Sequence, residues 1–318
     1  MLFFTWYSSL RKLVRLDLLI LPIHVIATQY YKYFYTRQIL QNFTLATRSK
    51  TKSTKTTTEI PKAISSTILG DHYNGETQQA SLHFHEQLLR ALAEDVNQVN
   101  FPEDFFNIYL IDVSTAANDY AAKKRRNMSS SVNDMFCAVQ ITVLSCSCSL
   151  NQTIFEDKIS LNINVTFDAS NIDLLGCLAR HFQTWTSNVK CHSCSKPQLP
   201  ARIYFWRLPP ILIIHLGRWK DGEKNERFVD FPLENLDISP YLHPNSQVNG
   251  MGLYSLYGIL QHHIVDAENG HFTAKVKNIQ ANDWMLCNDT VVSEINAADV
   301  KTTDAFTLYY KKMDRQAF

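Results

Sequence analysis

The sequence predicts an α+β fold. Apolar residues recur at the spacing of an amphipathic helix between Gly75 and Val99. Apolar and polar residues then alternate, as in strands, between Phe136 and Phe167. A second helical pattern runs from Asn171 to Phe182, and strand patterns continue to the end of the chain. Helices, strands, one helix and further strands in that order differ from the regular βαβ alternation that predicts a parallel sheet.

Composition limits the class of protein. The 318 residues, 45% of them hydrophobic, are enough for one large domain or two smaller ones. The formal net charge is +1, which argues against a dedicated nucleic-acid binder. The chain has 7 cysteines, an odd number with two closely spaced pairs. This pattern favours metal-binding thiols in a reducing compartment over a secreted disulfide framework.

Residues 1–59 form an atypical N-terminal segment. Its longest uncharged stretch, Leu18–Tyr31, contains Pro22 and is shorter than the ~20 apolar residues that span a bilayer. We therefore expect a buried or amphipathic helix there, with membrane anchoring as the alternative. Residues 46–59 are polar, basic and rich in threonine, which is typical of a solvated linker. The main domain is predicted to begin at residue 60.

Two further patterns precede any assignment of function. The basic run Lys123–Arg126 favours a solvated helix face or loop over a nuclear-localisation signal. The hexapeptide ILIIHL, residues 211–216, is apolar except for His215 and follows a Pro-Pro pair, which indicates a buried strand.

Four cysteines form the first chemical pattern. Cys191 and Cys194 make a C-x-x-C turn, and Cys146 and Cys148 make a C-x-C pair at the end of a predicted strand. Together they supply the four sulfur ligands of a structural zinc site, although free thiols are the alternative. The remaining cysteines lie in apolar contexts and are interpreted as small core residues. They are Cys137, Cys177 and Cys287.

The second chemical pattern lies near the C-terminus. A strand pattern leads to His271, and the next strand pattern ends at Asn288 and Asp289. A histidine and an amide on neighbouring strands can form a hydrogen bond across a sheet. In a cysteine hydrolase, such a histidine deprotonates the thiol and the amide fixes the tautomer of its ring. A histidine that has only a structural role is the alternative.

Several blocks of the chain follow one another in a recognisable order. The first is the predicted glutamine-containing helix GETQQASLHFHEQLLRALAEDVN. The later blocks are LPPILIIHLGRW from Leu208, FVDFPLENLDISPYL from Phe228, YSLYGILQH from Tyr254, GHFTA from Gly270, WMLCND from Trp284 and TTDAFTLYYKK from Thr302. Each block alone is weak, but the ordered set is specific and resembles the ubiquitin-specific protease family over about residues 60–312.

The resemblance implies a papain-like fold with a thumb, a palm and zinc-type fingers. It places a protease-like domain at residues 60–312, the fingers at about residues 137–200 and a tail at residues 313–318. The zinc ligands of the fingers correspond to Cys146, Cys148, Cys191 and Cys194. The implied partners are ubiquitin and ubiquitinated proteins, with no nucleic acid, and the implied location is the cytoplasm or nucleus.

The implied reaction is thiol-dependent hydrolysis of isopeptide bonds after the C-terminal glycine of ubiquitin. On this resemblance His271 is the general base, Asn288 orients it and Asp289 is the neighbouring acidic residue. Ubiquitin contacts correspond to Gln78 and Gln79 on the helix and to Gly270 and Phe272, which line the channel for the ubiquitin tail.

One departure from the family dominates the prediction. The family's Cys box, which carries the nucleophile and an oxyanion-stabilising Asn, has no counterpart, and no cysteine precedes Cys137. The thumb is therefore predicted to be incomplete, and loss of such a nucleophile costs about a million-fold in turnover. The chain is then either an incomplete deubiquitinase or a catalytically dead ubiquitin-binding or scaffold protein. An unrelated zinc-stabilised module is disfavoured by the ordered blocks.

Overall fold

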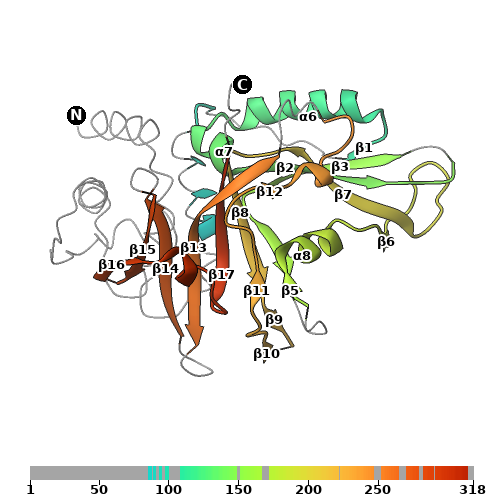
Figure 1. Ribbon diagram of the computed structural model, residues 1–318. Helices are drawn as coiled ribbons and strands as arrows, with labels where there is room; N and C mark the ends of the chain where they lie inside the picture. The colour runs from blue at the N-terminus through green and yellow to red at the C-terminus, as the bar shows by residue number, and fades with distance from the viewer. Residues whose placement is uncertain are drawn as a thin grey trace. The chain divides into compact units, whose positions relative to one another are not determined.

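The structure is a computed structural model, shown in Figure 1. It describes residues 85–87, 89–90, 93–94, 97–99, 108–148, 151–166, 172–221, 223–246, 252–264, 270–278, 282–289 and 291–313. The N-terminal segment 1–59, including Leu18–Tyr31, and the predicted ubiquitin contacts Gln78 and Gln79 lie outside these residues. The chain divides into two compact units, one within residues 1–91 and 257–308 and one within residues 92–256 and 309–318.

A five-stranded antiparallel sheet forms one part of the second unit. Its strands are, in spatial order, β1 (Ile108–Tyr109), β3 (Gln152–Lys158), β2 (Ala138–Leu144), β7 (Leu199–Arg207) and β6 (Trp185–Ser187). The two strands predicted between Phe136 and Phe167, at AVQITVLS and KISLNINVTF, are confirmed as β2 and as β4 (Leu161–Asn164). Strand β3 was not predicted.

Helix α6 (Val113–Asn127) packs on this sheet, as Figure 1 shows. Its buried side is made of Ala116, Ala117 and Tyr120, and the Tyr120 ring stacks on Phe155 of β3 at a centroid distance of 5.1 Å. The basic run predicted as a helix face or loop lies on α6, and its last three residues are in the final turn, where positive charge interacts favourably with the helix dipole. The short helix α7 (Ser131–Phe136) then leads into β2.

The predicted helix at residues 171–182 is confirmed as α8 (Leu174–His181). Asp173 caps it, because its carboxylate accepts a hydrogen bond from the backbone N–H of Gly176 at 2.6 Å. The predicted buried strand is confirmed as β8 (Ile211–Gly217), whose first six residues are all buried. In the second unit, β8 lies between β17 (Ala305–Lys312) and β4 (Leu161–Asn164), which it pairs in parallel.

Short strands complete the second unit. They are β5 (Ile172–Asp173) with β11 (Val229–Asp230), β9 (Trp219–Lys220) with β10 (Glu223–Lys224), and β12 (Leu236–Asp237), which pairs the start of β13. One 3-10 helix, η2 (Ser239–Tyr241), follows β12.

The first unit is built on an antiparallel sheet. Its strands are, in spatial order, β16 (Val291–Ile295), β15 (Asp283–Asn288), β14 (Gly270–Asn278), the part of β13 (Leu253–Ile264) from Tyr257 onward and the part of β17 up to Leu308. A 3-10 helix, η3 (Ala297–Asp299), connects β16 to β17. Within the predicted helix 75–99, residues 85–87, 89–90 and 93–94 are helical, and Leu89 is buried as its spacing predicted. The helices are segregated in sequence from strands that pair mainly antiparallel, which confirms the α+β class.

Among the described residues, no helix combines the length and the apolar character needed to cross a bilayer.

Candidate functional site

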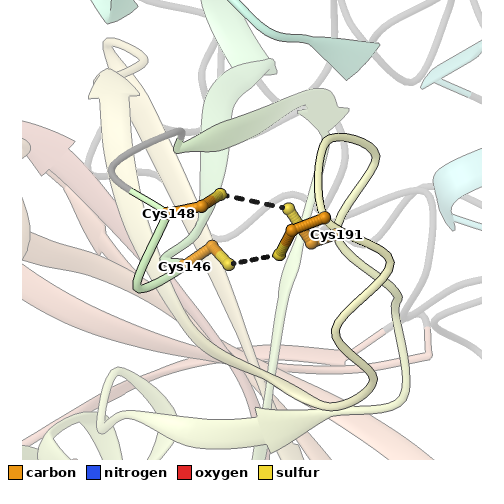
Figure 2. A group of neighbouring side chains, drawn as sticks. Cys146, Cys148 and Cys191 are labelled. Atoms are coloured by element: carbon orange, nitrogen blue, oxygen red, sulfur yellow. Dashed lines mark hydrogen bonds between the residues drawn. The ribbon is translucent and has the colours of Figure 1, made fainter.

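Four cysteine sulfurs lie together at one end of the five-stranded sheet. The sulfurs of Cys146, Cys148, Cys191 and Cys194 all lie within 4.8 Å of one another. The sulfur of Cys146 is 3.5 Å from that of Cys194, and the sulfur of Cys148 is 3.6 Å from that of Cys191. Figure 2 shows Cys146 and Cys148 on one chain segment, with Cys191 facing them from another. The C-x-C pair and the C-x-x-C turn therefore form one cluster.

Strand pairing explains how residues 48 positions apart meet. At the end of β2, Leu144 pairs with Gln152 of β3 on one side and with Ala201 of β7 on the other. The turn after β2 and the turn before β7 consequently lie at the same edge of the sheet. The first turn carries the C-x-C pair, and the second carries the C-x-x-C pair.

The cluster fits a zinc ion. Zinc–thiolate bonds of ~2.3 Å place the sulfurs of a tetrahedral site about 3.8 Å apart, close to the observed separations. Backbone N–H groups of Cys194 and Ser193 donate to the Cys191 sulfur and lower the pKa of that thiol to about 6. The N–H of Cys148 lowers the pKa of Cys146 in the same way. These donors stabilise the thiolate forms of Cys191 and Cys146, whereas the neighbouring sulfurs of Cys146 and Cys191 raise the pKa of Cys194 to about 11. The four close sulfurs could hold a structural zinc, whose binding would release the remaining protons.

The other three cysteines are buried, as the sequence predicted. Cys287 lies on β15 beside Asn288 and is only 1% exposed. Burial raises the pKa of its thiol to about 12. A buried thiol that holds its proton this strongly is a core residue and a poor nucleophile.

His271 and Asn288 meet across adjacent strands in the first unit. His271 is the second residue of β14, and Asn288 is the last residue of β15. The Nε2 atom of His271 lies 2.7 Å from Oδ1 of Asn288 and 3.9 Å from Oδ2 of Asp289. Asp289 has a left-handed backbone (φ 49°) in the turn that follows β15. The structure thus brings together the three residues that the sequence singled out at this end of the chain.

The hydrogen bond to Asn288 defines the state of the imidazole. Because Oδ1 of Asn288 can only accept, Nε2 of His271 must carry the proton. In the neutral ring, Nδ1 is then the basic nitrogen. The His271 side chain is 28% exposed, so a ligand can approach it.

Gly270 and Phe272 flank His271 in different ways. Phe272 points to the opposite face of β14, where its buried ring stacks on His262 at a centroid distance of 4.3 Å. A ligand beside His271 would therefore meet the backbone of Phe272 rather than its ring. Gly270 has no space for a side chain, because an added Cβ would collide with the ring of His262.

Sequence reasoning missed a group of polar residues on the His271 face. His263 of β13 is the cross-strand partner of His271, and its ring contacts Thr273 and Asp304. The adjacent histidines of the QHH sequence were the available signal. The register that selects His263 for this face could not be read from the sequence.

Comparison with known proteins identifies the family. The family model described as "Ubiquitin carboxyl-terminal hydrolase" matches residues 24–310. The chain belongs to the ubiquitin carboxyl-terminal hydrolase family. Ubiquitin carboxyl-terminal hydrolase 5 of Arabidopsis thaliana is 34% identical over 127 residues, which are 38% of this chain and 14% of that protein. Ubiquitin carboxyl-terminal hydrolase 2 of Bos taurus is 24% identical over 250 residues, which are 74% of this chain and 41% of that protein.

Solved structures of DUB modules are similar to this chain in fold and confirm the predicted fold class. A SAGA DUB module bound to ubiquitin aldehyde matches with a TM-score of 0.60 at 16% identity, covering 92% of this chain and 66% of that chain. A SAGA DUB module bound to monoubiquitin matches with a TM-score of 0.59 at 21% identity, covering 78% and 52%. This chain spans less than half the length of the curated relatives named above.

Proposed function

We propose that this chain binds ubiquitin and carries the imidazole part of a deubiquitinase site. In this proposal His271 is the general base, Asn288 orients its ring and Asp289 is the neighbouring acidic residue. The hydrogen bond between His271 and Asn288 carries the proposal, because a family hydrolase needs an imidazole of defined tautomer at this place.

The geometry suits proton transfer at Nδ1 of His271. Asn288 holds the proton on Nε2, so a thiol placed opposite Nδ1 would lose its proton to that atom. The resulting imidazolium would lie 3.9 Å from the carboxylate of Asp289. The thiolate would attack the carbonyl carbon of the last glycine of ubiquitin, so that a thioester forms, the isopeptide bond breaks and water later hydrolyses the thioester. His271 would then return the proton to the leaving amine.

The printed chain has no thiol suited to that attack. No cysteine precedes Cys137, and Cys287 is buried with its proton firmly held. We therefore propose that the chain as printed binds ubiquitin without hydrolysing it, as a scaffold or as the ubiquitin-binding part of a larger catalytic unit.

The domain boundaries and contacts belong to the same proposal. Residues 60–312 form the protease-like domain, with fingers at about residues 137–200. Ubiquitinated proteins are the partners, and the ubiquitin tail runs past Gly270 and the backbone of Phe272. Gln78 and Gln79 supply further ubiquitin contacts.

Calorimetric titration with ubiquitin tests the binding. We expect a dissociation constant of about 1–100 μM for intact ubiquitin. Ubiquitin that lacks its two terminal glycines should bind at least about tenfold more weakly, because the part of the tail nearest His271 is gone. Glu294→Gln, an exposed change on β16, is the matched control and should leave both affinities unchanged. Absence of heat with intact ubiquitin, for a chain that unfolds cooperatively, rejects the proposal.

A reactive probe tests the second half of the proposal. Ubiquitin with a thiol-reactive group in place of its C-terminal carboxylate should form no covalent adduct with the chain by intact-mass spectrometry. An adduct at any of the 7 cysteines would contradict the proposed lack of hydrolysis, and peptide mapping would identify the reacting thiol.

A further inference from the structure

Five polar side chains form a continuous chain of contacts on the face of the sheet that bears His271. Gln261 and His263 belong to β13, Thr273 belongs to β14, and Thr302 and Asp304 precede β17. Nε2 of Gln261 donates to the Thr302 hydroxyl at 2.5 Å, and the Thr273 hydroxyl donates to Oε1 of Gln261 at 3.3 Å. Nε2 of His263 lies 2.8 Å from Oγ1 of Thr273, and Nδ1 of His263 lies 3.1 Å from the Asp304 carboxylate.

A count of protons along this network defines the state of His263. The amide of Gln261 uses its nitrogen on Thr302, so it presents its oxygen to Thr273. The single hydroxyl proton of Thr273 goes to that oxygen, so Thr273 must accept a proton from Nε2 of His263. The Asp304 carboxylate can only accept, so Nδ1 of His263 must also carry a proton. The network is complete when His263 is an imidazolium.

The same network holds the immediate neighbours of His271. His263 is opposite His271 in the β13–β14 register, and the two rings lie 6.5 Å apart at 25°. Thr273 is two residues along β14 from His271, on the same face. Asp304 fixes β13 a second time, because its backbone oxygen accepts from the N–H of His262 at 2.9 Å.

Other charged groups on this face complete the electrostatic environment. Lys275 of β14 points the same way as Thr273, and its ammonium donates to the backbone oxygens of Asp299 and Val300. The carboxylates of Asp299 and Asp304 counter the burial that lowers the pKa of Lys275. On this face His263 contacts the Asp304 carboxylate and the His271 ring, the Lys275–Asp299 group lies farther along β14, and Asp289 lies 3.9 Å from His271.

We propose that His263 is a positioning residue for His271, held as an imidazolium between Asp304 and Thr273. A ring with protons on both nitrogens accepts no further proton, so His263 cannot compete with His271 as a base. Its two hydrogen bonds instead keep the strand pair that carries His271 in one geometry. The role rests on the proposed function, because it matters only if His271 is the working base.

Nitrogen NMR of the full chain, with labelled histidines assigned by substitution, tests the proposal. At about pH 7.5, above the ordinary histidine pKa of ~6.5, His263 should show two protonated nitrogens and His271 one, at Nε2. Asp304→Asn removes the charge with almost no change of shape and should leave His263 with a single proton. Exchange of the Nε2 proton of His271 should then rise about fivefold, the factor that corresponds to a hydrogen bond of ~1 kcal/mol. Glu294→Gln, which removes a carboxylate from exposed β16, should change neither signal.

Each outcome decides one part of the proposal. A single proton on His263 in the unaltered chain overturns the imidazolium, since Thr273 then donates to His263. If the exchange rate of the Nε2 proton of His271 is unchanged in both Asp304→Asn and His263→Gln, the positioning role is overturned. Titration of the same samples with ubiquitin separates the two proposals. A normal His263 signature without a response to ubiquitin rejects the proposed function alone, whereas a response to ubiquitin with a singly protonated His263 rejects the positioning role alone.

Discussion

Replacement of one thiol in the four-cysteine cluster should uncouple the stability of the protein from zinc. We choose Cys191→Ser, because Cys191 is the buried member of the cluster and lies 3.6 Å from the Cys148 sulfur. A serine hydroxyl is a hard, protonated group at neutral pH and replaces a thiolate poorly as a zinc ligand. The remaining sulfurs would bind zinc far more weakly.

The size of the effect follows from ligand linkage. Free zinc at ~100 times its dissociation constant stabilises a folded site by about 2.7 kcal/mol. In a unit of about 150–250 residues, 1 kcal/mol moves the melting temperature by about 2–4 °C, so zinc should raise it by about 5–11 °C. Cys191→Ser should melt at the same temperature with zinc and with a chelator.

Differential scanning calorimetry with buffered zinc and with chelator provides the assay, and metal analysis should find one zinc per unaltered chain. Cys177→Ser is the matched control, because Cys177 is a buried thiol of α8 outside the cluster. That variant should lose some stability yet keep the full response to zinc. A melting temperature of the unaltered chain that is the same with zinc and with chelator would refute the zinc site. An equal zinc response in Cys191→Ser would refute the role of Cys191.

Three further changes test the pH response, the core and the strand pair at His271. Burial and the nearby Arg218 lower the pKa of His215 to about 4, so His215 takes up protons more readily in the unfolded chain between pH ~6.5 and ~4. This difference in pKa contributes about 3 kcal/mol to the free energy of unfolding, which is complete above pH ~6.5 and is lost as the pH falls toward 4. His215→Gln should therefore flatten the dependence of the unfolding free energy on pH, measured by urea unfolding. An unchanged pH dependence would argue against the burial of His215. Ile214→Ala in fully buried β8 should cost about 2–5 kcal/mol in urea unfolding, whereas Val291→Ala, at a site that is 64% exposed, should stay within about 0.5 kcal/mol; equal losses would contradict the assigned core. Gly270→Ala should cost about 1–3 kcal/mol of unfolding free energy because the new methyl group meets His262, and a neutral effect in the same assay would show that the β13–β14 pair has space there.

The sequence predicted the elements whose patterns are strong and local. Strand β8 was visible because its apolar residues are continuous, and α8 because its periodicity is clear. Helix α6 was not assigned, because it buries the small residues Ala116 and Ala117 with Tyr120 and has no apolar stripe. Strand β3 was missed because its second half, from Glu156, is polar and partly exposed.

The cysteine cluster was predictable in its members and not in its geometry. The C-x-C spacing left free thiols as an alternative, since two ligands one residue apart are cramped on one ion. In the structure the sulfur of Cys146 contacts that of Cys194 and the sulfur of Cys148 contacts that of Cys191. Each member of the C-x-C pair therefore faces a different member of the C-x-x-C turn. This arrangement depends on the pairing of β2 with β7, a long-range contact that no local pattern reports.

The same reasoning separates the predictable part of the histidine site from the rest. His271 and Asn288 could be placed because consecutive strands in a hairpin pair with each other. A polar residue at the start of the first strand then lies near a polar residue at the end of the second. The contact of His263 with Asp304 could not be predicted. The β13–β14 register decides whether His263 or His262 lies on this face, and a slip of one residue would exchange the two. That dependence gives the hydrogen-bond network a second consequence. A slip of one residue along β13 would bring His262 to the face of Asp304 and break the stack of His262 on Phe272, so that stack and the ion pair of His263 with Asp304 together favour the observed β13–β14 register.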